Sequence, residues 1–248
     1  MRRADLFLVV VLSVSFLAVS PVRAAPIDLS SWSADGRGNW TLQTQDETND
    51  SVFESLNSGP SVFFNNMESQ GLFLSGTIEV QTTTDDDFVG FVLGYDPGDV
   101  FGSNATTDYI LVDWKQGAQS GQNPGMRISR VTGAIDTCGT CTNSNAWNHT
   151  GNVSVIQDAA TLGDVAWADN TSYMFDILFT STNIQVDIDG VQQFSINGVF
   201  ENGSFGFYNF SQPSVLYAGI GSGVIPEPST AILMGLGLLA MGTRSRQR

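Results

Sequence analysis

Basic residues are scarce in this chain, and their scarcity limits what it can bind. Ten Lys and Arg stand against 25 Asp and Glu, which gives a formal net charge of −15 at pH 7. Six of the ten basic residues lie in the first 24 and last 25 positions, so the chain between them has 4 basic and 23 acidic residues, a net of −19. Such a surface repels phosphate groups and excludes nucleic acid as a partner. It favours a soluble surface that binds cations.

Long hydrophobic runs are missing as well, and the two longest apolar stretches lie at the chain ends. Residues 1–24 begin with a basic Met-Arg-Arg, continue with an apolar run over 6–18 and end in Val22-Arg23-Ala24. This order is typical of a secretory signal peptide, and we expect cleavage after Ala24. A membrane-spanning helix needs roughly 20 apolar residues, so this run is too short for one. The chain is therefore expected to be exported.

The other end of the chain, residues 224–248, carries a second targeting pattern. Pro226-Glu227-Pro228 is followed by an apolar segment over 231–242 and a tail with three arginines. This order resembles the PEP-CTERM sorting signal of Gram-negative bacteria. The resemblance implies that a membrane-embedded exosortase processes the chain near the Pro-Glu-Pro, and that the protein reaches the cell surface or the medium. The arginines would stay on the cytoplasmic side and anchor the segment in the membrane transiently, because positive charges stop translocation.

Cysteine and histidine are nearly absent, which excludes several chemistries. Cys138 and Cys141 with the single His149 are too few for a structural zinc site of about four ligands. The polar residues around Cys138-x-x-Cys141 indicate a loop, not the context of a redox motif. In an exported chain we expect the two cysteines to form a small disulfide-closed loop.

Short apolar runs separated by Gly, Asn, Thr and Ser fill the rest of the chain. The expected strands are residues 40–43, 51–56, 61–64, 71–81, 88–95, 109–114, 126–131, 172–179, 183–189, 191–196 and 204–210. Asp189-Gly190 predicts a tight hairpin between two of them. About ten short strands with frequent turn signals predict an all-β fold, a two-sheet antiparallel β-sandwich. Residues 25–223 are long enough to form it as one domain.

Three consecutive carboxylates, Asp85, Asp86 and Asp87, directly precede the strand predicted for residues 88–95. In a strand Asp85 and Asp87 would share a face and Asp86 would point away. In a turn all three could surround one cation, and hard oxygen ligands suit Ca²⁺. The alternative is a solvated turn in which Asp only makes local hydrogen bonds.

The sequence around these aspartates resembles a known family. DDDFVGFVLGY followed by YILVDWKQ is similar to the core of the thrombospondin C-terminal domain, a calcium-binding, lectin-like β-sandwich of the concanavalin A or L-type lectin jelly-roll class. Segments 145–152, 163–173 and 203–212 resemble further blocks of that family in the same order, over roughly residues 51–220. The resemblance implies that Asp85–Asp87 bind calcium. The upstream EGF-like and aspartate-rich repeats of the animal proteins have no counterpart here, so animal-type receptor binding is not implied.

Two further interpretations concern ligands and catalysis. Trp114, Trp147, Trp167, Tyr95 and Tyr173 could line a sugar-binding face, although large aromatic residues in a sandwich more often form the core.

A glycoside hydrolase would need two carboxyl groups on either side of a sugar. Asp187 and Asp189 alternate onto one face of a strand, but the Asp-Gly that follows indicates that Asp189 is a turn residue. A serine or cysteine nucleophile would depend on His149 as its base.

These patterns together predict an exported, non-catalytic module that binds Ca²⁺ and acts in adhesion or in the extracellular matrix, such as a biofilm, at the bacterial surface. Exosortase would process its PEP-CTERM tail, and exopolysaccharide or surface proteins would be its partners. The alternative is a lectin-type carbohydrate-binding module that recognises exopolysaccharide. A glycoside hydrolase is the third hypothesis.

Overall fold

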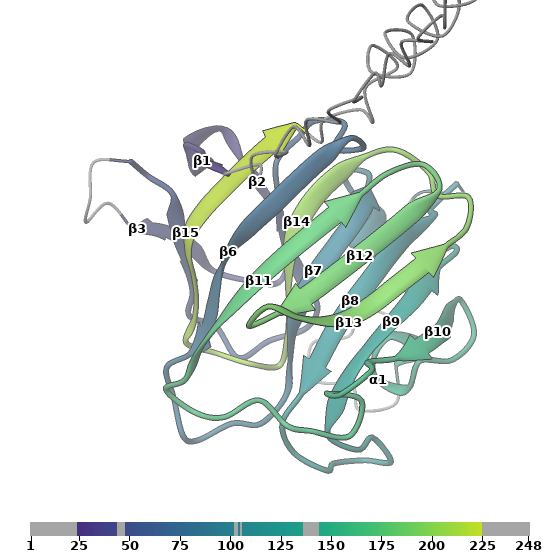
Figure 1. Cartoon of the computed structure of the whole chain (residues 1–248). Coiled ribbons are helices and arrows are strands. Elements are labelled where there is room, and N and C mark those ends of the chain that lie inside the picture. Colours follow the sequence, from purple (N-terminus) through teal and green to yellow (C-terminus); the bar gives the residue numbers. More distant parts are fainter. Residues whose placement is uncertain (1–23, 44–47, 102–103, 105, 136–143, 225–248) are drawn as a thin grey trace, which may run out of the picture.

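Two antiparallel β-sheets packed face to face make up the computed structural model, which describes residues 24–43, 48–101, 104, 106–135 and 144–224 (Figure 1). The eight-stranded sheet contains, in order, β13 (Val191–Asn197), β12 (Asn183–Ile188), β11 (Ser172–Phe179), β6 (Leu72–Val80), β15 (Val215–Val224), β4 (Ser51–Glu54) and β3 (Trp40–Gln43), with β1 (Ala25–Pro26) also on β15. The seven-stranded sheet contains β10 (Val153–Asp158), β9 (Gly125–Val131), β8 (Tyr109–Lys115), β7 (Phe88–Tyr95), β14 (Ser204–Phe210), β5 (Ser61–Phe64) and β2 (Ser33–Gly36). The predicted all-β sandwich is confirmed.

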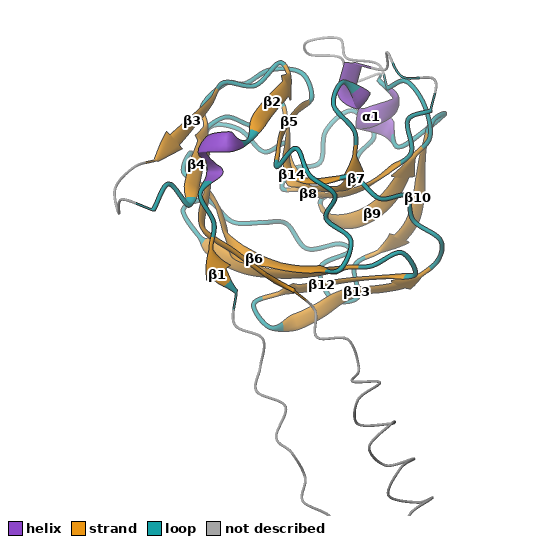
Figure 2. Ribbon diagram, turned by 90° about the horizontal axis from the view of Figure 1, so that it is seen from above, coloured by secondary structure: helices purple, strands orange, loops and turns teal. Residues whose placement is uncertain are grey.

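The seven-stranded sheet is covered on both faces, which explains why β7 and β8 are buried along their whole length. Alternate residues such as Val112 and Trp114 pack between the two sheets, while Tyr109 and Leu111 belong to a second apolar cluster on the opposite face. The short helix α1 (Asn145–Asn148) lies over that second cluster (Figure 2). Single-turn helices η1 (Leu29–Ser31) and η2 (Asp99–Phe101) complete the described elements.

The aromatic residues named from the sequence are core residues, as expected. Trp114, Trp147, Trp167 and Tyr95 are buried, and Tyr173 packs against the main core. They do not form an exposed sugar-binding face.

Five strands have the same bounds as the ranges predicted from the sequence. The expected ranges 40–43, 61–64, 88–95, 172–179 and 204–210 match β3, β5, β7, β11 and β14. The Asp189-Gly190 hairpin is also confirmed, with both residues at positive φ, 49° and 73°.

Four strands were not expected: β1, β2, β10 and β15. β10 is an edge strand with five exposed residues out of six, so it carries no alternating pattern. β15 contains three glycines and a register shift between Ala218 and Gly221, which hide its periodicity.

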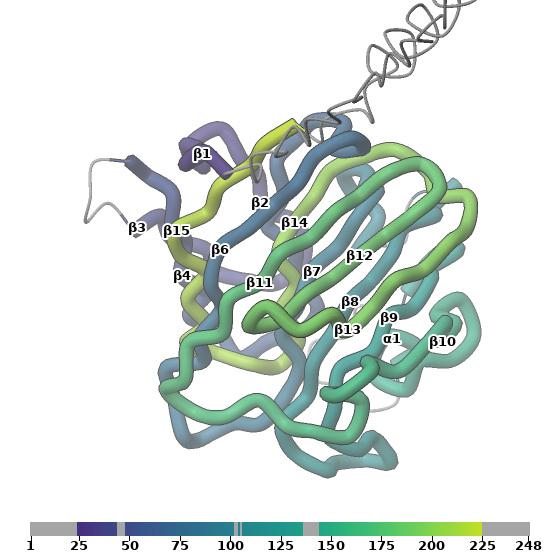
Figure 3. Tube along the Cα trace, viewed as in Figure 1, coloured from purple at the N-terminus to yellow at the C-terminus, as the bar shows by residue number. Residues whose placement is uncertain are grey.

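The sandwich has two distinct ends, set by the pairing of β6 with β15. Leu72 pairs with Val224 at one end, and Val80 pairs with Val215 at the other. The first is called the terminal end, because β1 joins β15 there through Ala25 and Ser222 (Figure 3). The second is called the aspartate end, because Asp85–Asp87 follow Val80 there. No helix within the described residues is long and apolar enough to cross a membrane.

Candidate metal site

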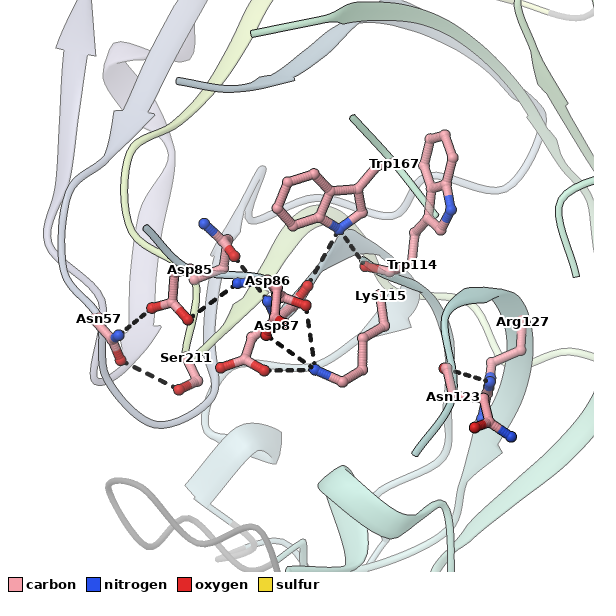
Figure 4. A network of polar contacts seen from close by, with 11 residues as sticks. Asn57, Asp85, Asp86, Asp87, Trp114, Lys115, Asn123, Arg127, Trp167 and Ser211 are labelled. Carbon is pink, nitrogen blue, oxygen red and sulfur yellow. Dashed lines mark hydrogen bonds and ion pairs between the residues drawn. The ribbon is translucent and has the colours of Figure 1, made fainter. Parts of the chain in front are cut away.

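Asp85, Asp86 and Asp87 lie in the segment that crosses from β6 in one sheet to β7 in the other. This segment is irregular, with a bend at Thr83 and Thr84, and local hydrogen bonds support it: Thr84 N–H donates to Thr82 Oγ1 (3.2 Å), and Asp86 N–H donates to Asp85 Oδ1 (3.1 Å). Strand alternation therefore does not apply to the three aspartates. One carboxylate oxygen from each lies within 4.8 Å of the others. We call Asp85–Asp87 the aspartate turn (Figure 4).

Asp87 is the buried member of the turn, with 3% of its surface exposed. Its N–H donates to Gln212 Oε1 (2.9 Å), and its carbonyl accepts from Trp167 Nε1 (3.2 Å). Its carboxylate Oδ1 lies 2.6 Å from Lys115 Nζ. These contacts tie Asp87 to β8, to the loop after β14 and to the loop before β11, so that its position is fixed by the protein itself.

Lys115 is the single lysine of the sequence, and it is completely buried. It is paired with Phe88 across β7 and β8, which places it under α1. Its ammonium group lies 4.7 Å from the ring centre of Trp147 and 5.0 Å from that of Phe88, a cation–π geometry. Burying an unpaired ammonium is costly, and Asp87 together with the two rings offsets that cost.

Hydrogen bonds to its carbonyl group position Asp86, and the lack of a side chain at Gly117 leaves space for its carboxylate. Its carbonyl accepts hydrogen bonds from Gln116 N–H (3.2 Å) and Gly117 N–H (2.9 Å), and from Lys115 Nζ (3.2 Å). A Cβ on Gly117 would lie 1.7 Å from Asp86 Oδ2. Only glycine at position 117 therefore leaves room for the Asp86 carboxylate where it lies.

Asp85 is the third member, and Asn57 Nδ2 donates a hydrogen bond to its Oδ2. Asn57 in turn accepts from Ser211 Oγ (3.2 Å). Burial, followed by the negative charges of Asp87 and Asp86, raises the pKa of Asp85 to about 6. A divalent cation in the turn would favour the ionised form and reverse this effect.

The spacing of the three carboxylates is compatible with a metal ion that takes oxygen ligands. Ca²⁺–oxygen distances of about 2.3–2.6 Å place opposite ligands roughly 5 Å apart, close to the observed spread of 4.8 Å. Three carboxylates and one ammonium give a local charge of −2, which a divalent cation neutralises. Asp85 and Asp86 also border an open depression with four polar neighbours: Thr83, Thr84, Gln116 and Gln119. The aspartate turn can therefore hold a metal ion.

Sequence reasoning located the three aspartates but not the residues that fix them. Lys115 stood within the quoted YILVDWKQ segment, and its being the only lysine was a usable signal. Gln212, Asn57 and Gly117 gave no signal, because their contacts with the turn cross long sequence distances or depend on an empty space. The predicted disulfide of Cys138 and Cys141 and the Pro226-Glu227-Pro228 motif lie outside the described residues.

His149 is buried beneath the surface and engages a carboxylate. It ends α1 with a left-handed backbone (φ 49°), and its Nε2 lies 2.7 Å from Asp113 Oδ2, both side chains being at most 2% exposed. Within the described residues the ring thus has no open path to a substrate. The arrangement links α1 to β8, a structural role.

The carboxylate pair considered for glycoside hydrolysis is not the one that the fold assembles. Asp189 lies in the hairpin turn, where its Oδ1 accepts from Met174 N–H (2.8 Å). Asp187 instead faces Asp176 directly across β12 and β11. Burial raises the pKa of Asp187. The pKa of Asp176 is also raised, first by burial and second by the negative charge of Asp187.

This two-sheet architecture is that of a lectin-like β-sandwich. The VIP36 exoplasmic/lumenal domain, in its Ca²⁺/Man2-bound form, superposes with a TM-score of 0.51 at 13% identity, covering 81% of this chain and 83% of that one. Carbohydrate-binding module CBM66 from Bacillus subtilis gives a TM-score of 0.54 at 11% identity, covering 82% of this chain and 99% of the module. At such identities the likeness shows the fold alone.

The chain belongs to the thrombospondin C-terminal region family, whose model matches residues 36–222. Thrombospondin-3b of Danio rerio is 26% identical over 208 residues, covering 74% of this chain and 20% of that protein. Cartilage oligomeric matrix protein of Rattus norvegicus is 23% identical over 208 residues, covering 73% of this chain and 25% of that protein. The chain thus spans a fifth to a quarter of the length of these relatives.

Residues 224–247 match the PEP-CTERM protein-sorting motif. This motif implies exosortase processing and export to the cell surface in bacteria. Both resemblances drawn from the sequence are confirmed.

Proposed function

We propose that this protein is a non-catalytic, calcium-binding adhesion or matrix module, displayed at the surface of a Gram-negative bacterium through its PEP-CTERM tail. The observation that carries the proposal is the convergence of three carboxylates within 4.8 Å beside a single buried ammonium. Without an ion the three carboxylates repel one another, and Ca²⁺ would remove this cost while rigidifying the crossing between the sheets. Membership of the thrombospondin C-terminal region family supports the same ion.

A lectin function is the second candidate, and it is favoured by the likeness to VIP36 in its Ca²⁺/Man2-bound form. The open depression beside Asp85 and Asp86 could accept a hydroxylated ligand. Its lining, however, consists of Thr, Asp and Gln, and offers no aromatic ring on which a sugar could stack. For this reason we rank adhesion through a bound ion ahead of sugar recognition.

We propose residues 25–223 as the domain that carries this function.

Calcium titration calorimetry and thermal unfolding of the chain starting at Ala25 test the proposal. A ligand that binds only the folded state adds about 2.7 kcal/mol of stability at a hundredfold excess over its dissociation constant. We expect Ca²⁺ to raise the melting temperature, and Asp85→Asn with Asp86→Asn to abolish the rise. Asp164→Asn, an exposed carboxylate outside the turn, is the control and should respond like the wild type. A melting temperature that is the same in EDTA and in millimolar Ca²⁺ would reject the calcium site.

A further inference from the structure

The fold continues almost to the sorting motif. β15 ends at Val224, the Pro-Glu-Pro sequence starts two residues later at Pro226, and the apolar segment starts at Ala231. The seven residue steps from Val224 to Ala231 span at most about 25 Å of chain. While the apolar segment is held in a membrane, the terminal end of the sandwich is therefore kept close to the membrane surface. β1 pairs with β15 beside this point, so the N-terminal strand lies at the same end.

The terminal end exposes large apolar side chains on its loops. Val199 and Val224 are each 74% exposed, the highest values among the exposed large hydrophobic residues of the described chain. Met67 at 55% and Phe101 at 51% lie on other loops of this end. Val199 follows β13, Met67 follows β5 and Phe101 ends η2 after β7. We call these four residues the apolar rim.

Hydrogen bonds hold two of these loops together, so that their apolar side chains project from a fixed base. Gln70 Nε2 donates to Phe200 O (2.8 Å), and Asn202 Nδ2 donates to Glu68 Oε2 (2.8 Å). These bonds join the loop after β5 to the loop after β13. The rim therefore cannot bury its side chains by local rearrangement without breaking these contacts. A lipid headgroup layer would remove the same apolar area from water.

The charges at this end indicate which kind of membrane surface fits. Arg130 Nη1 donates to Val199 O (3.4 Å), but its guanidinium is paired with Asp108 (2.5 Å). Glu68 and Glu201 lie on the two loops themselves. The rim therefore carries no net positive charge that would attract anionic headgroups. Its exposed apolar side chains suit the surface of a zwitterionic bilayer instead.

We propose that the apolar rim, Met67, Phe101, Val199 and Val224, rests in the headgroup layer of a zwitterionic phospholipid bilayer while the sorting segment tethers the chain. The inference rests on the sorting role of the tail and is independent of calcium binding. It fixes the orientation of the module. β6 separates the two ends by roughly 26 Å at about 3.3 Å per residue, so the aspartate turn faces away from the membrane, toward partners outside the cell.

Photocrosslinking to lipid tests this orientation. The full chain would be reconstituted into phosphatidylcholine vesicles with a benzophenone side chain in place of Val199 or Met67. Val165, 45% exposed and held at the aspartate end by Trp114 Nε1, is the matched control position. Leu236 within the sorting segment serves as the reference for tethering. We expect lipid adducts at Val199 and Met67 about fivefold or more above those at Val165, unchanged by EDTA.

Three results would overturn the proposal. Adducts at Val199 and Met67 no more frequent than at Val165 would show that the end does not touch lipid. Absence of adducts at Leu236 would show that the tail does not tether the domain. Adducts that disappear in EDTA would show that the aspartate turn, and not the rim, controls the contact. A failure of calcium binding with adducts intact would refute only the calcium proposal.

Discussion

Lys115 Nζ lies 2.6 Å from Asp87 Oδ1, with the lysine fully buried and the aspartate nearly so. This ion pair joins the aspartate turn to the strand beneath α1. Its first consequence is that Lys115 compensates one of the three carboxylate charges of the turn, with Asp86 Oδ1 also 3.9 Å from its ammonium group, so that a net charge of −2 remains. Its second consequence is that the pair couples the stability of the fold to the site.

Removing the ammonium should destabilise the protein strongly. Lys115→Met leaves the Asp87 carboxylate buried without its cation, and breaking one side of a buried pair costs about 3–5 kcal/mol of unfolding free energy. Asp87→Asn in the same chain should recover part of that loss. Millimolar Ca²⁺ should stabilise Lys115→Met more than the wild type, because the turn then carries −3. Urea unfolding with and without Ca²⁺ measures both effects, and equal unfolding free energies of variant and wild type in EDTA would contradict the role of the pair.

Gly117→Ala should weaken calcium binding while every aspartate is kept. The added Cβ needs the space of Asp86 Oδ2, so the carboxylate must move. Displacing a ligand support typically costs about 10- to 100-fold in metal affinity, and we expect a loss in this range by calorimetry. The effect should disappear in an Asp86→Ala background, because no side-chain oxygen is then left for the added Cβ to displace. A full effect of Gly117→Ala in that background would show that Asp86 is not its target.

Glu54 should make stability depend on pH near neutrality. Burial raises its pKa to about 7, against the lowering effect of hydrogen bonds from Asn39 N–H, Leu56 N–H and Asn209. Because the pKa in the folded state lies above the ordinary value of 4.5, the contribution to stability is complete below pH 4.5 and is lost as pH rises through 7. The wild type should lose up to about 3 kcal/mol over this window. Glu54→Gln should flatten the curve measured by denaturant unfolding; an unchanged slope would exclude Glu54 as its source.

Replacing one carboxylate of the Asp176–Asp187 pair should stabilise the protein at neutral pH. The two residues face each other across β11 and β12, and like charges in this arrangement repel. Asp176→Asn should raise the unfolding free energy at pH 7 by about 0.5 kcal/mol. The gain should vanish below pH 4, where the wild-type carboxyls are protonated. A loss of stability at pH 7 would indicate an attractive contact that the pair makes as carboxylates.

The sequence predicted best those segments whose conformation depends on the preferences of their own residues. Phe88–Tyr95 and Ser204–Phe210 are dense in β-branched and aromatic residues, and Asp189-Gly190 is a turn by the backbone preference of its own two residues. β15 was missed because its strand conformation depends on pairing with β4 and β6, which no local pattern of Ala and Gly encodes.

The residues of the candidate site also fall into two groups, those that the sequence indicated and those that only the fold brings together. Three adjacent aspartates indicated a cation site because their carboxylates can converge wherever the backbone is not an extended strand. The residues that complete the site are distant in sequence: Asn57 lies in the loop after β4, Lys115 on β8 and Gln212 in the loop after β14. The sequence indicated correctly that Asp189 is a turn residue, but not that Asp187 faces Asp176 on the neighbouring strand.

Sequence alone therefore determined the all-β class, the C-terminal sorting motif and the place of the acidic cluster, since each of these depends on residues that are neighbours in the chain. Only the tertiary structure decided that a buried lysine neutralises Asp87, that Gly117 makes room for Asp86, and that the aspartate turn and the last residue of β15 lie at opposite ends of the sandwich. These features depend on the register of strands far apart in sequence, which is fixed when the two sheets pack and bury their apolar faces.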